Sequence, residues 1–255
     1  MNDIKTLTIK FSVPQGKTLN QSVGSIMQGV MMEHISSAYA TKLHEQGLNP
    51  YSQYSHFDRK TSTLTWTINA LNSEACTKII DELKQNLPTV IHLHKKQFNL
   101  TVKAKQITNE TNYSELAETY LTNECPVYKY SEFNFDTSTS FKNKGEYMIF
   151  PNQFLVLNSL LNRWNNFAQS EAIEEENLAL NLAMQTYVSS YEMKLVPFYL
   201  ERTKILAFKG KYILGLKTDT SLKNIIYLLT TYAKFAGVGI KTSVGMGATI
   251  TKLLK

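Results

Sequence analysis

Residues 237–247 constrain the fold more than any other stretch, because they hold four of the chain's 11 glycines. Their sequence is Gly-Val-Gly-Ile-Lys-Thr-Ser-Val-Gly-Met-Gly. Glycine accepts positive φ and a close backbone neighbour at no steric cost. Helically spaced apolar residues precede the segment, and only residues 248–255 follow it, enough for one strand. We therefore predict a helix, a glycine-rich loop and a last strand, in that order.

Two familiar glycine motifs are excluded, one by this order and the other by the position of the lysine. A dinucleotide-binding fingerprint needs a strand before its glycines and a helix after them. That order is the reverse of the one predicted here. A phosphate-binding Walker loop needs Gly-Lys-Ser/Thr, whereas here Ile240 separates Gly239 from Lys241. The segment is then either a plain turn or a loop whose N–H groups wrap a phosphodiester backbone, with Lys241, Thr242 and Ser243 adding a charge and two hydroxyls.

The charge distribution favours the second interpretation. Residues 202–255 carry ten Lys/Arg and one acid, a net charge of +9, while the other 201 residues carry a net charge of −3. A basic segment of this kind is the electrostatic footprint expected for a polyanion, although a solvated basic surface would have the same composition.

The composition is otherwise that of an ordinary globular protein, with 43% hydrophobic and 19% charged residues. No apolar run reaches the roughly 18 residues of a membrane span. The N-terminus lacks the apolar core of a signal peptide. Cys76 and Cys125 have no metal-ligand spacing around them. We expect a cytoplasmic protein with neither membrane partner, metal nor other cofactor.

The first half reads as strand, helix, strand, strand, helix, strand, which is the order of a ferredoxin-like unit. The predicted strands are 6–13, 54–57, 63–70 and a pair at 90–94 and 98–102, and the predicted helices are 20–37, 39–46 and one capped by Ser73. Residues 109–124 are polar and acidic, and we interpret them as a connection. The first domain is predicted to span residues 1–120.

The second half repeats this order less regularly, with an inserted helical segment. The predicted strands are 132–141, 147–150, 187–196, 205–216 and 248–255, and the predicted helices are one opened by Pro151, one at 177–184 and the helix before the glycine-rich loop. The fold class is therefore α+β, with two tandem ferredoxin-like domains and antiparallel sheets. The second domain is predicted to span residues 121–255.

Histidine is the strongest candidate for chemistry. His44 lies at the end of the first helical region, beside Gly47 and Asn49-Pro50, where a side chain is open to a ligand. An imidazole exchanges protons near neutral pH. Lys42 could serve a developing negative charge, Tyr39 offers a phenol, and His34 lies ten residues earlier.

The other histidines are weaker candidates. His92 and His94 share one face of a predicted strand but lack a third ligand, so they indicate an ordinary sheet-face pair rather than a metal site.

Several stretches of the sequence resemble a known family. Residues 237–248 resemble the signature loop of the CRISPR-associated repeat-processing endoribonucleases, the Cas six family of the RAMP superfamily. Three stretches resemble the helix-plus-histidine region of that family: Gln28-Gly29-Val30-Met31-Met32, Leu43-His44-Glu45 and Asn49-Pro50-Tyr51. Lys144-Gly145-Glu146-Tyr147-Met148-Ile149-Phe150-Pro151 resembles a segment of the shorter type III-associated members.

The resemblance implies metal-independent cleavage of precursor CRISPR RNA within each repeat. The family's catalytic histidine would correspond to His44, and the glycine-rich loop would contact the RNA backbone. Some members use a Tyr, His and Lys set, but Met32 stands near the tyrosine position and no lysine follows His44 until Lys60. Others use two histidines, which keeps His34 as a candidate.

The expected reaction is attack of the RNA 2′-hydroxyl on the adjacent phosphorus, giving a 2′,3′-cyclic phosphate and a 5′-hydroxyl. His44 would be the base or the acid. The partner would be CRISPR repeat RNA, with or without a CRISPR effector complex, and the protein a monomer or homodimer. Two alternatives remain: a non-catalytic RNA-binding subunit on the same fold, and a metal-dependent nuclease. The expected RNA contacts are Lys204, Lys209, Lys211, Gly237, Gly239, Lys241, Thr242, Ser243, Gly245 and Gly247.

Overall fold

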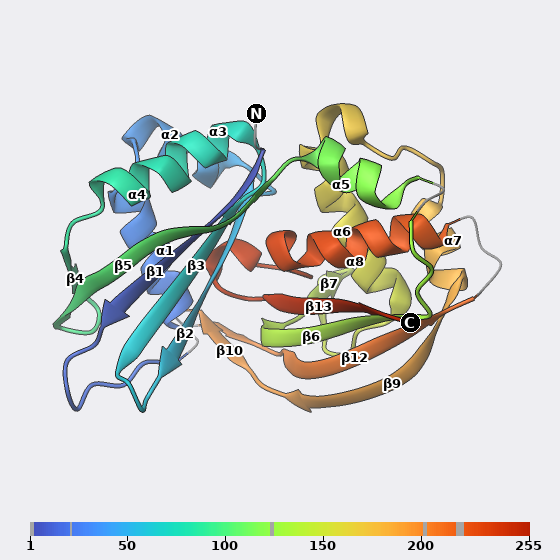
Figure 1. The fold of residues 1–255 in the computed structure, drawn as a ribbon. Helices are drawn as coiled ribbons and strands as arrows, with labels where there is room; N and C mark the ends of the chain where they lie inside the picture. The colour runs from blue at the N-terminus through green and yellow to red at the C-terminus, as the bar shows by residue number, and fades with distance from the viewer. Residues whose placement is uncertain (1–2, 21, 123–124, 201–202, 218–221) are drawn as a thin grey trace. The chain divides into compact units, whose positions relative to one another are not determined.

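The chain divides into two compact units (Figure 1). The computed structural model describes residues 3–20, 22–122, 125–200, 203–217 and 222–255. The first unit is Met1–Thr111 with Ser243–Gly245, and the second is Asn112–Thr242 with Met246–Lys255. The division falls at Thr111 and Asn112 instead of between residues 120 and 121, because the following helix packs into the second unit. There, the Tyr113 hydroxyl lies 3.1 Å from the Tyr232 hydroxyl.

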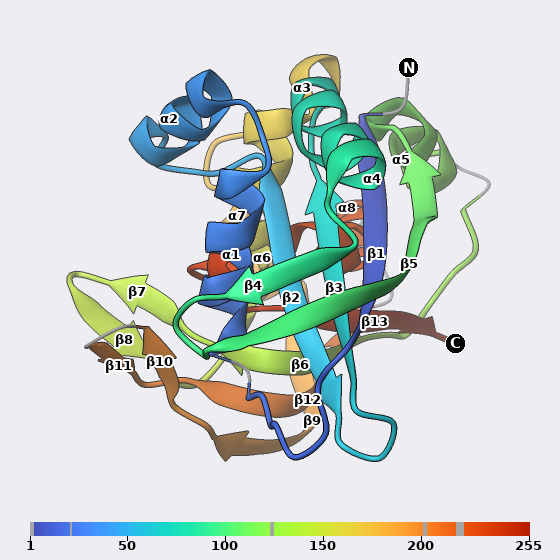
Figure 2. The same cartoon turned by 90° about the vertical axis from the view of Figure 1, so that its left-hand side faces the viewer.

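The first unit is built on a five-stranded antiparallel sheet, drawn in Figure 2. Its spatial order is β2-β3-β1-β5-β4, so the ferredoxin-like core is β2-β3-β1-β5 and β4 is an extra edge strand. The strands are β1 (Ile4–Ser12), β2 (Tyr51–Asp58), β3 (Thr63–Ala70), β4 (Val90–Leu93) and β5 (Phe98–Thr111). The predicted strand at 98–102 is in fact 14 residues long, and it pairs with β1 from Thr101 to Thr111.

Side-chain caps start α2 and α3, two of the helices described in this unit. The predicted helix at 20–37 ends at Glu33, because the Ser36 side chain accepts a hydrogen bond from Tyr39 N and starts a second helix. The Asn72 side chain, rather than Ser73, caps the later helix. The elements are α1 (Val23–Glu33), α2 (Ser37–Glu45), and α3 (Ser73–Ala75) continuing through a π-helical segment, Cys76–Asp81, into α4 (Glu82–Asn86).

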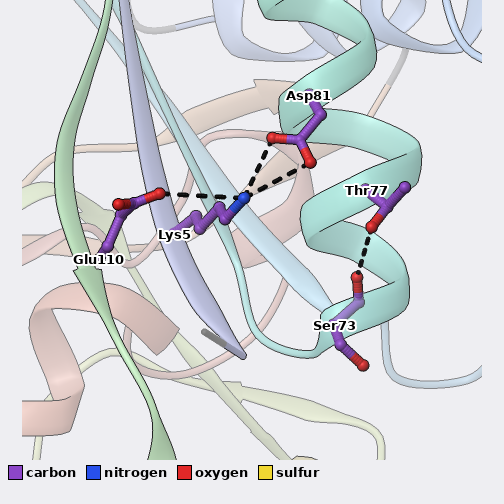
Figure 3. Close-up of polar contacts among 5 residues, drawn as sticks. All are labelled: Lys5, Ser73, Thr77, Asp81 and Glu110. Carbon is purple, nitrogen blue, oxygen red and sulfur yellow. Dashed lines mark hydrogen bonds and ion pairs between the residues drawn. The ribbon is translucent and has the colours of Figure 1, made fainter. Parts of the chain in front are cut away.

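Alternate residues of the strands form the core of the first unit with one face of these helices. Phe11 and Trp66 are fully buried, with ring centroids 6.4 Å apart. At the edge of this core, Lys5 of β1 lies between two carboxylates, as Figure 3 shows. Its Nζ is 3.1 Å from Asp81 and 3.8 Å from Glu110 of β5. The lysine therefore ties the sheet to the π-helical segment.

The second unit repeats the topology with a four-stranded antiparallel sheet of order β13-β6-β12-β9. Two small hairpins, β7-β8 and β10-β11, extend its connections. The strands are β6 (Tyr130–Thr139), β7 (Phe141–Asn143), β8 (Glu146–Met148), β9 (Thr186–Leu195), β10 (Phe198–Leu200), β11 (Thr203–Ile205), β12 (Phe208–Leu216) and β13 (Thr249–Leu254). The two units are therefore tandem ferredoxin-like folds.

Four α-helices lie in the described part of the second unit, and α6 and α8 pack together in its core (Figure 1). They are α5 (Tyr113–Tyr120), α6 (Gln153–Phe167), α7 (Leu178–Met184) and α8 (Lys223–Ala236). The predicted helix start at Pro151 shifts by two residues, because the Asn152 side chain caps α6 by accepting from Leu155 N. Trp164 of α6 packs edge-to-face on Tyr232 of α8, with ring centroids 5.2 Å apart. Among the described residues, no helix has both the length and the apolar character to cross a membrane.

Candidate active site and nucleic-acid interface

His44 is an exposed side chain in the last turn of α2. The helix ends one residue later, and Gln46 turns into extended backbone. The imidazole is therefore open to a ligand at the end of the helix.

Lys42 is directed away from His44. Lys42 and His44 are two positions apart, and such residues are separated by about 200° around a helix axis. Lys42 forms an ion pair with Glu74 of α3, with Nζ 2.6 Å from one carboxylate oxygen and 2.8 Å from the other. Both partners are about half exposed, so the pair contributes little to stability. Lys42 is therefore already paired with Glu74, and its expected service to a developing negative charge stays a prediction.

Tyr39 belongs to the core of the first unit. Its side chain is 4% exposed, and its hydroxyl has no hydrogen-bond partner among the described residues. Burial, followed by the nearby Glu74 carboxylate, raises the pKa of Tyr39 above its usual value. A phenol with a raised pKa is a poorer proton donor, and a buried one does not reach substrate. The expected role of Tyr39 in the chemistry is therefore not supported.

His34 lies at the C-cap of α1 and is half-buried. Its Nδ1 lies 2.8 Å from the Val30 carbonyl oxygen. A carbonyl can only accept, so Nδ1 donates and Nε2 is the nitrogen left to accept a proton. His34 keeps a usable ring nitrogen, but its ring is fixed to α1.

The glycine-rich loop owes its glycines to its own packing. A Cβ on Gly247, where φ is +71°, would lie 2.1 Å from the Val238 carbonyl oxygen. A Cβ on Gly239 would lie 2.3 Å from the Ser140 carbonyl oxygen. Val238 N also donates to the Gly247 carbonyl over 2.8 Å, which closes the loop. These contacts account for the two glycines without any ligand.

The other expected loop contacts differ in exposure. Gly237, Gly245 and Thr242 are buried, and the Thr242 methyl group packs against Gly237. Lys241 is exposed, while Ser243 is half-buried. Of the loop side chains, Lys241 is therefore best placed to meet a phosphate.

The tip of the loop, Ser243–Gly245, belongs to the first unit. Gln53 of β2, which is 1% exposed, donates from Nε2 to the Gly24 carbonyl over 2.8 Å and to the Ser243 carbonyl over 3.1 Å. Trp66 Nε1 donates to Gln53 Oε1 over 2.8 Å. A Cβ on Gly24 would lie 2.6 Å from the Val244 carbonyl oxygen, so the backbone of α1 packs directly against the backbone of the loop tip. Gln53 therefore holds the backbone of the tip, while Asn49 Nδ2 donates to the Ser243 hydroxyl over 3.4 Å, and nothing in the sequence singled out Gln53.

The expected basic contacts lie on the second unit. Lys204 is exposed on the hairpin β10-β11. Burial lowers the pKa of Lys209, against the effect of Asp136. Lys211 lies 3.3 Å from Glu132 on the neighbouring strand β6. Lys204 and Lys241 are therefore the least engaged of the predicted cations.

No three His, Cys, Asp or Glu side chains of the described ranges converge in a way that could hold a metal ion.

Comparison with known proteins converges on one family. A family model described as CRISPR-associated endoribonuclease Cas6 matches residues 133–249, which include the glycine-rich loop. CRISPR-associated endoribonuclease Cas6 of Mycobacterium tuberculosis is 27% identical over 243 residues, covering 95% of this chain and 76% of that protein. The Cas6 endoribonuclease of Streptococcus thermophilus is 28% identical over 227 residues, covering 89% of this chain and 90% of that protein.

Solved structures show the same fold. A product complex of the Thermus thermophilus Cas6 protein TTHB231 matches with a TM-score of 0.81 and 18% identity. The match covers 99% of this chain and 100% of that one. The likeness therefore extends through both units and is not confined to the segment that the family model matches.

Proposed function

Because the chain belongs to the Cas6 family of CRISPR-associated endoribonucleases, we propose that it cleaves precursor CRISPR RNA within its repeats, with His44 as the catalytic residue. The exposure of His44 at the end of α2 carries this assignment. Of the four candidate side chains, it alone is neither buried, ion-paired nor hydrogen-bonded to its own helix among the described residues.

The proposed reaction is an internal transesterification. The ribose 2′-oxygen forms a bond to the adjacent phosphorus while the bond from phosphorus to the 5′-oxygen breaks. One proton leaves the 2′-hydroxyl and one reaches the departing 5′-oxygen, giving a 2′,3′-cyclic phosphate and a 5′-hydroxyl. His44 acts as base or acid for one of these transfers. Substrate binding would be supported by the phosphate contacts of Lys241 and Lys204.

In this proposal neither Tyr39 nor Lys42 assists His44. General acid–base catalysis by one side chain contributes typically 10²–10⁴-fold, so a single imidazole accounts for a slow but measurable reaction. The reaction as proposed needs no metal ion. His34 remains the second candidate imidazole, and its Nε2 is the candidate for the other proton transfer.

The decisive experiment compares the wild type with His44→Ala on repeat RNA. We expect the variant to bind RNA and keep its thermal stability, because His44 is exposed, but to lose cleavage by at least two orders of magnitude. His56, an exposed histidine on β2, provides the matched control in His56→Ala, which should cut at the wild-type rate.

Two further conditions test the chemistry. EDTA should leave the rate unchanged, and a 2′-deoxy substitution at the scissile nucleotide should stop cleavage but spare binding. Full activity of His44→Ala would remove His44 from the mechanism. Loss of activity in EDTA would replace this mechanism with a metal-dependent one, and RNA binding without cutting by the wild type would refute the proposed reaction.

A further inference from the structure

A small pocket lies in the first unit between α1 and the turn that joins β4 to β5. Its volume is about 150 Å³. It is smaller than the roughly 300–1,000 Å³ of a site for a drug-sized ligand, so it suits one small planar group rather than a large cofactor.

The floor and the rim of the pocket differ in character. The floor is apolar and consists of Ile26, Val30 and Leu93. The rim carries His92 from β4, His94 and Lys95 from the β4-β5 turn, and Glu33 from the last turn of α1. An apolar floor with donors and an acceptor at the rim is the pattern that fixes the orientation of a flat, polar-edged ligand.

The two histidine rings at the rim are held as a pair. Their centroids are 4.8 Å apart and their planes meet at 73°. His92 Nδ1 lies 2.7 Å from Asn99 Oδ1, which accepts and so fixes the His92 ring. His92, His94 and Glu33 are not placed to share a metal ion, since the described part of the chain has no such group of three. An oriented aromatic pair beside a cation is instead suited to stacking a base next to its phosphate.

Gly29 of α1 gives a second and independent indication. It lies in the middle of the helix, where glycine is less favourable than other residues. A Cβ at Gly29 would meet nothing within 4 Å, so no neighbouring atom requires its absence. Gly29 does line the pocket. The absence of a side chain at Gly29 therefore leaves the pocket open, while it lowers the stability of α1.

From these observations we propose that the pocket of α1 and the β4-β5 turn receives one unpaired nucleobase of the RNA substrate. The base packs on the apolar floor and against the histidine pair. Glu33 accepts a hydrogen bond from an exocyclic amine, and Lys95 contacts the adjoining phosphate. This inference rests on the proposed function, because it takes RNA to be the ligand.

The test is a binding measurement that does not depend on cleavage. Fluorescence anisotropy of repeat RNA with a 2′-deoxy scissile nucleotide is recorded with the wild type, Gly29→Leu and the control Gly29→Ala. Leucine fills the pocket, and we expect binding about tenfold weaker, the effect of losing one stacked base. Alanine should bind like the wild type. Both variants should melt at or above the wild-type temperature, because both residues are better helix formers than glycine.

An abasic scan of the same RNA identifies the ligand group. At one position, removing the base should weaken binding to the wild type about tenfold and have no further effect with Gly29→Leu. His92→Ala should weaken binding in the same way and at the same position.

Equal binding by Gly29→Leu and the wild type would overturn the inference, as would effects that add at every position. A methylphosphonate at one position that reproduces the loss, with no abasic position doing so, would make the site a phosphate site and overturn the base assignment. If the wild type binds and cuts RNA while Gly29→Leu binds normally, only this inference fails. If the wild type neither binds nor cuts RNA, the proposed function fails as well.

Discussion

Replacing Gln53 with leucine should destabilise the first unit by about 3–4 kcal/mol. Leucine keeps approximately the volume of glutamine but removes three hydrogen bonds in a site that is 1% exposed. Trp66 Nε1 would lose the only acceptor that the structure gives it, at a cost of about 2 kcal/mol. The Gly24 carbonyl lies within α1 and keeps its helical bond, so we assign about 0.5–1 kcal/mol each to it and to the Ser243 carbonyl.

Urea unfolding of Gln53→Leu measures the total loss of unfolding free energy. Hydrogen exchange of peptides from β2 and β3 then shows whether that loss lies in the first unit. Gln53→Glu is the matched variant, because it keeps an acceptor for Trp66 but places a carboxylate against two carbonyl oxygens. It should be at least as destabilising at pH 7, and acidification should recover part of the loss by protonating that carboxylate.

A loss below about 1 kcal/mol for Gln53→Leu, with unchanged exchange in β2 and β3, would refute this reasoning. It would mean that water or a rearranged backbone satisfies the Trp66 indole when the amide is gone.

Three other predictions concern the second unit. Burial raises the pKa of Tyr212 to about 12, so the folded state keeps a proton that the unfolded chain releases near pH 10, and stability should fall as pH rises from about 10 to 12. Tyr212→Phe should remove this alkaline loss in urea titrations and, since the hydroxyl has no partner in the described structure, stabilise the protein at pH 7 by about 1 kcal/mol. Arg163 is 6% exposed, and its Nη1 has no partner among the described atoms. Arg163→Met should therefore stabilise the protein by about 1–2 kcal/mol and raise its melting temperature. A lower melting temperature would indicate a partner for the guanidinium. Lys241→Ala should reduce the slope of log binding constant against log salt by about 0.7 for single-stranded RNA, whereas Lys84→Ala, at an exposed position on α4, should leave the slope unchanged.

Periodicity predicted much of the fold, because it directly reflects burial. Tyr39 and Leu43 are four residues apart in α2 and both are buried, whereas His44 is exposed. The helical repeat alone would have separated Tyr39 from His44. The extension of β5 to Thr111 was missed because residues 103–111 are mostly polar and resemble a connection. Pairing with β1, rather than an apolar face, makes that segment a strand.

The loop shows where sequence reasoning stops. Glycines at 239 and 247 indicated a special backbone, and the structure has one. The sequence did not distinguish glycines that meet a ligand from glycines that meet the chain itself, because both need the same φ. The role of Gln53 could not be predicted for a related reason, because a polar residue in a hairpin strand normally faces solvent. Its burial is explained by its three hydrogen-bond partners, which only the structure shows.

The return of Ser243–Gly245 to the first unit has a consequence for biosynthesis. During translation, β1 to β5 emerge from the ribosome long before this tripeptide does. Until then the nascent first unit lacks the backbone that contacts Gly24, and Gln53 has one acceptor fewer. A truncated protein ending at Thr111 should therefore be less soluble than the complete chain, and adding the tripeptide through a flexible tether should recover part of the difference.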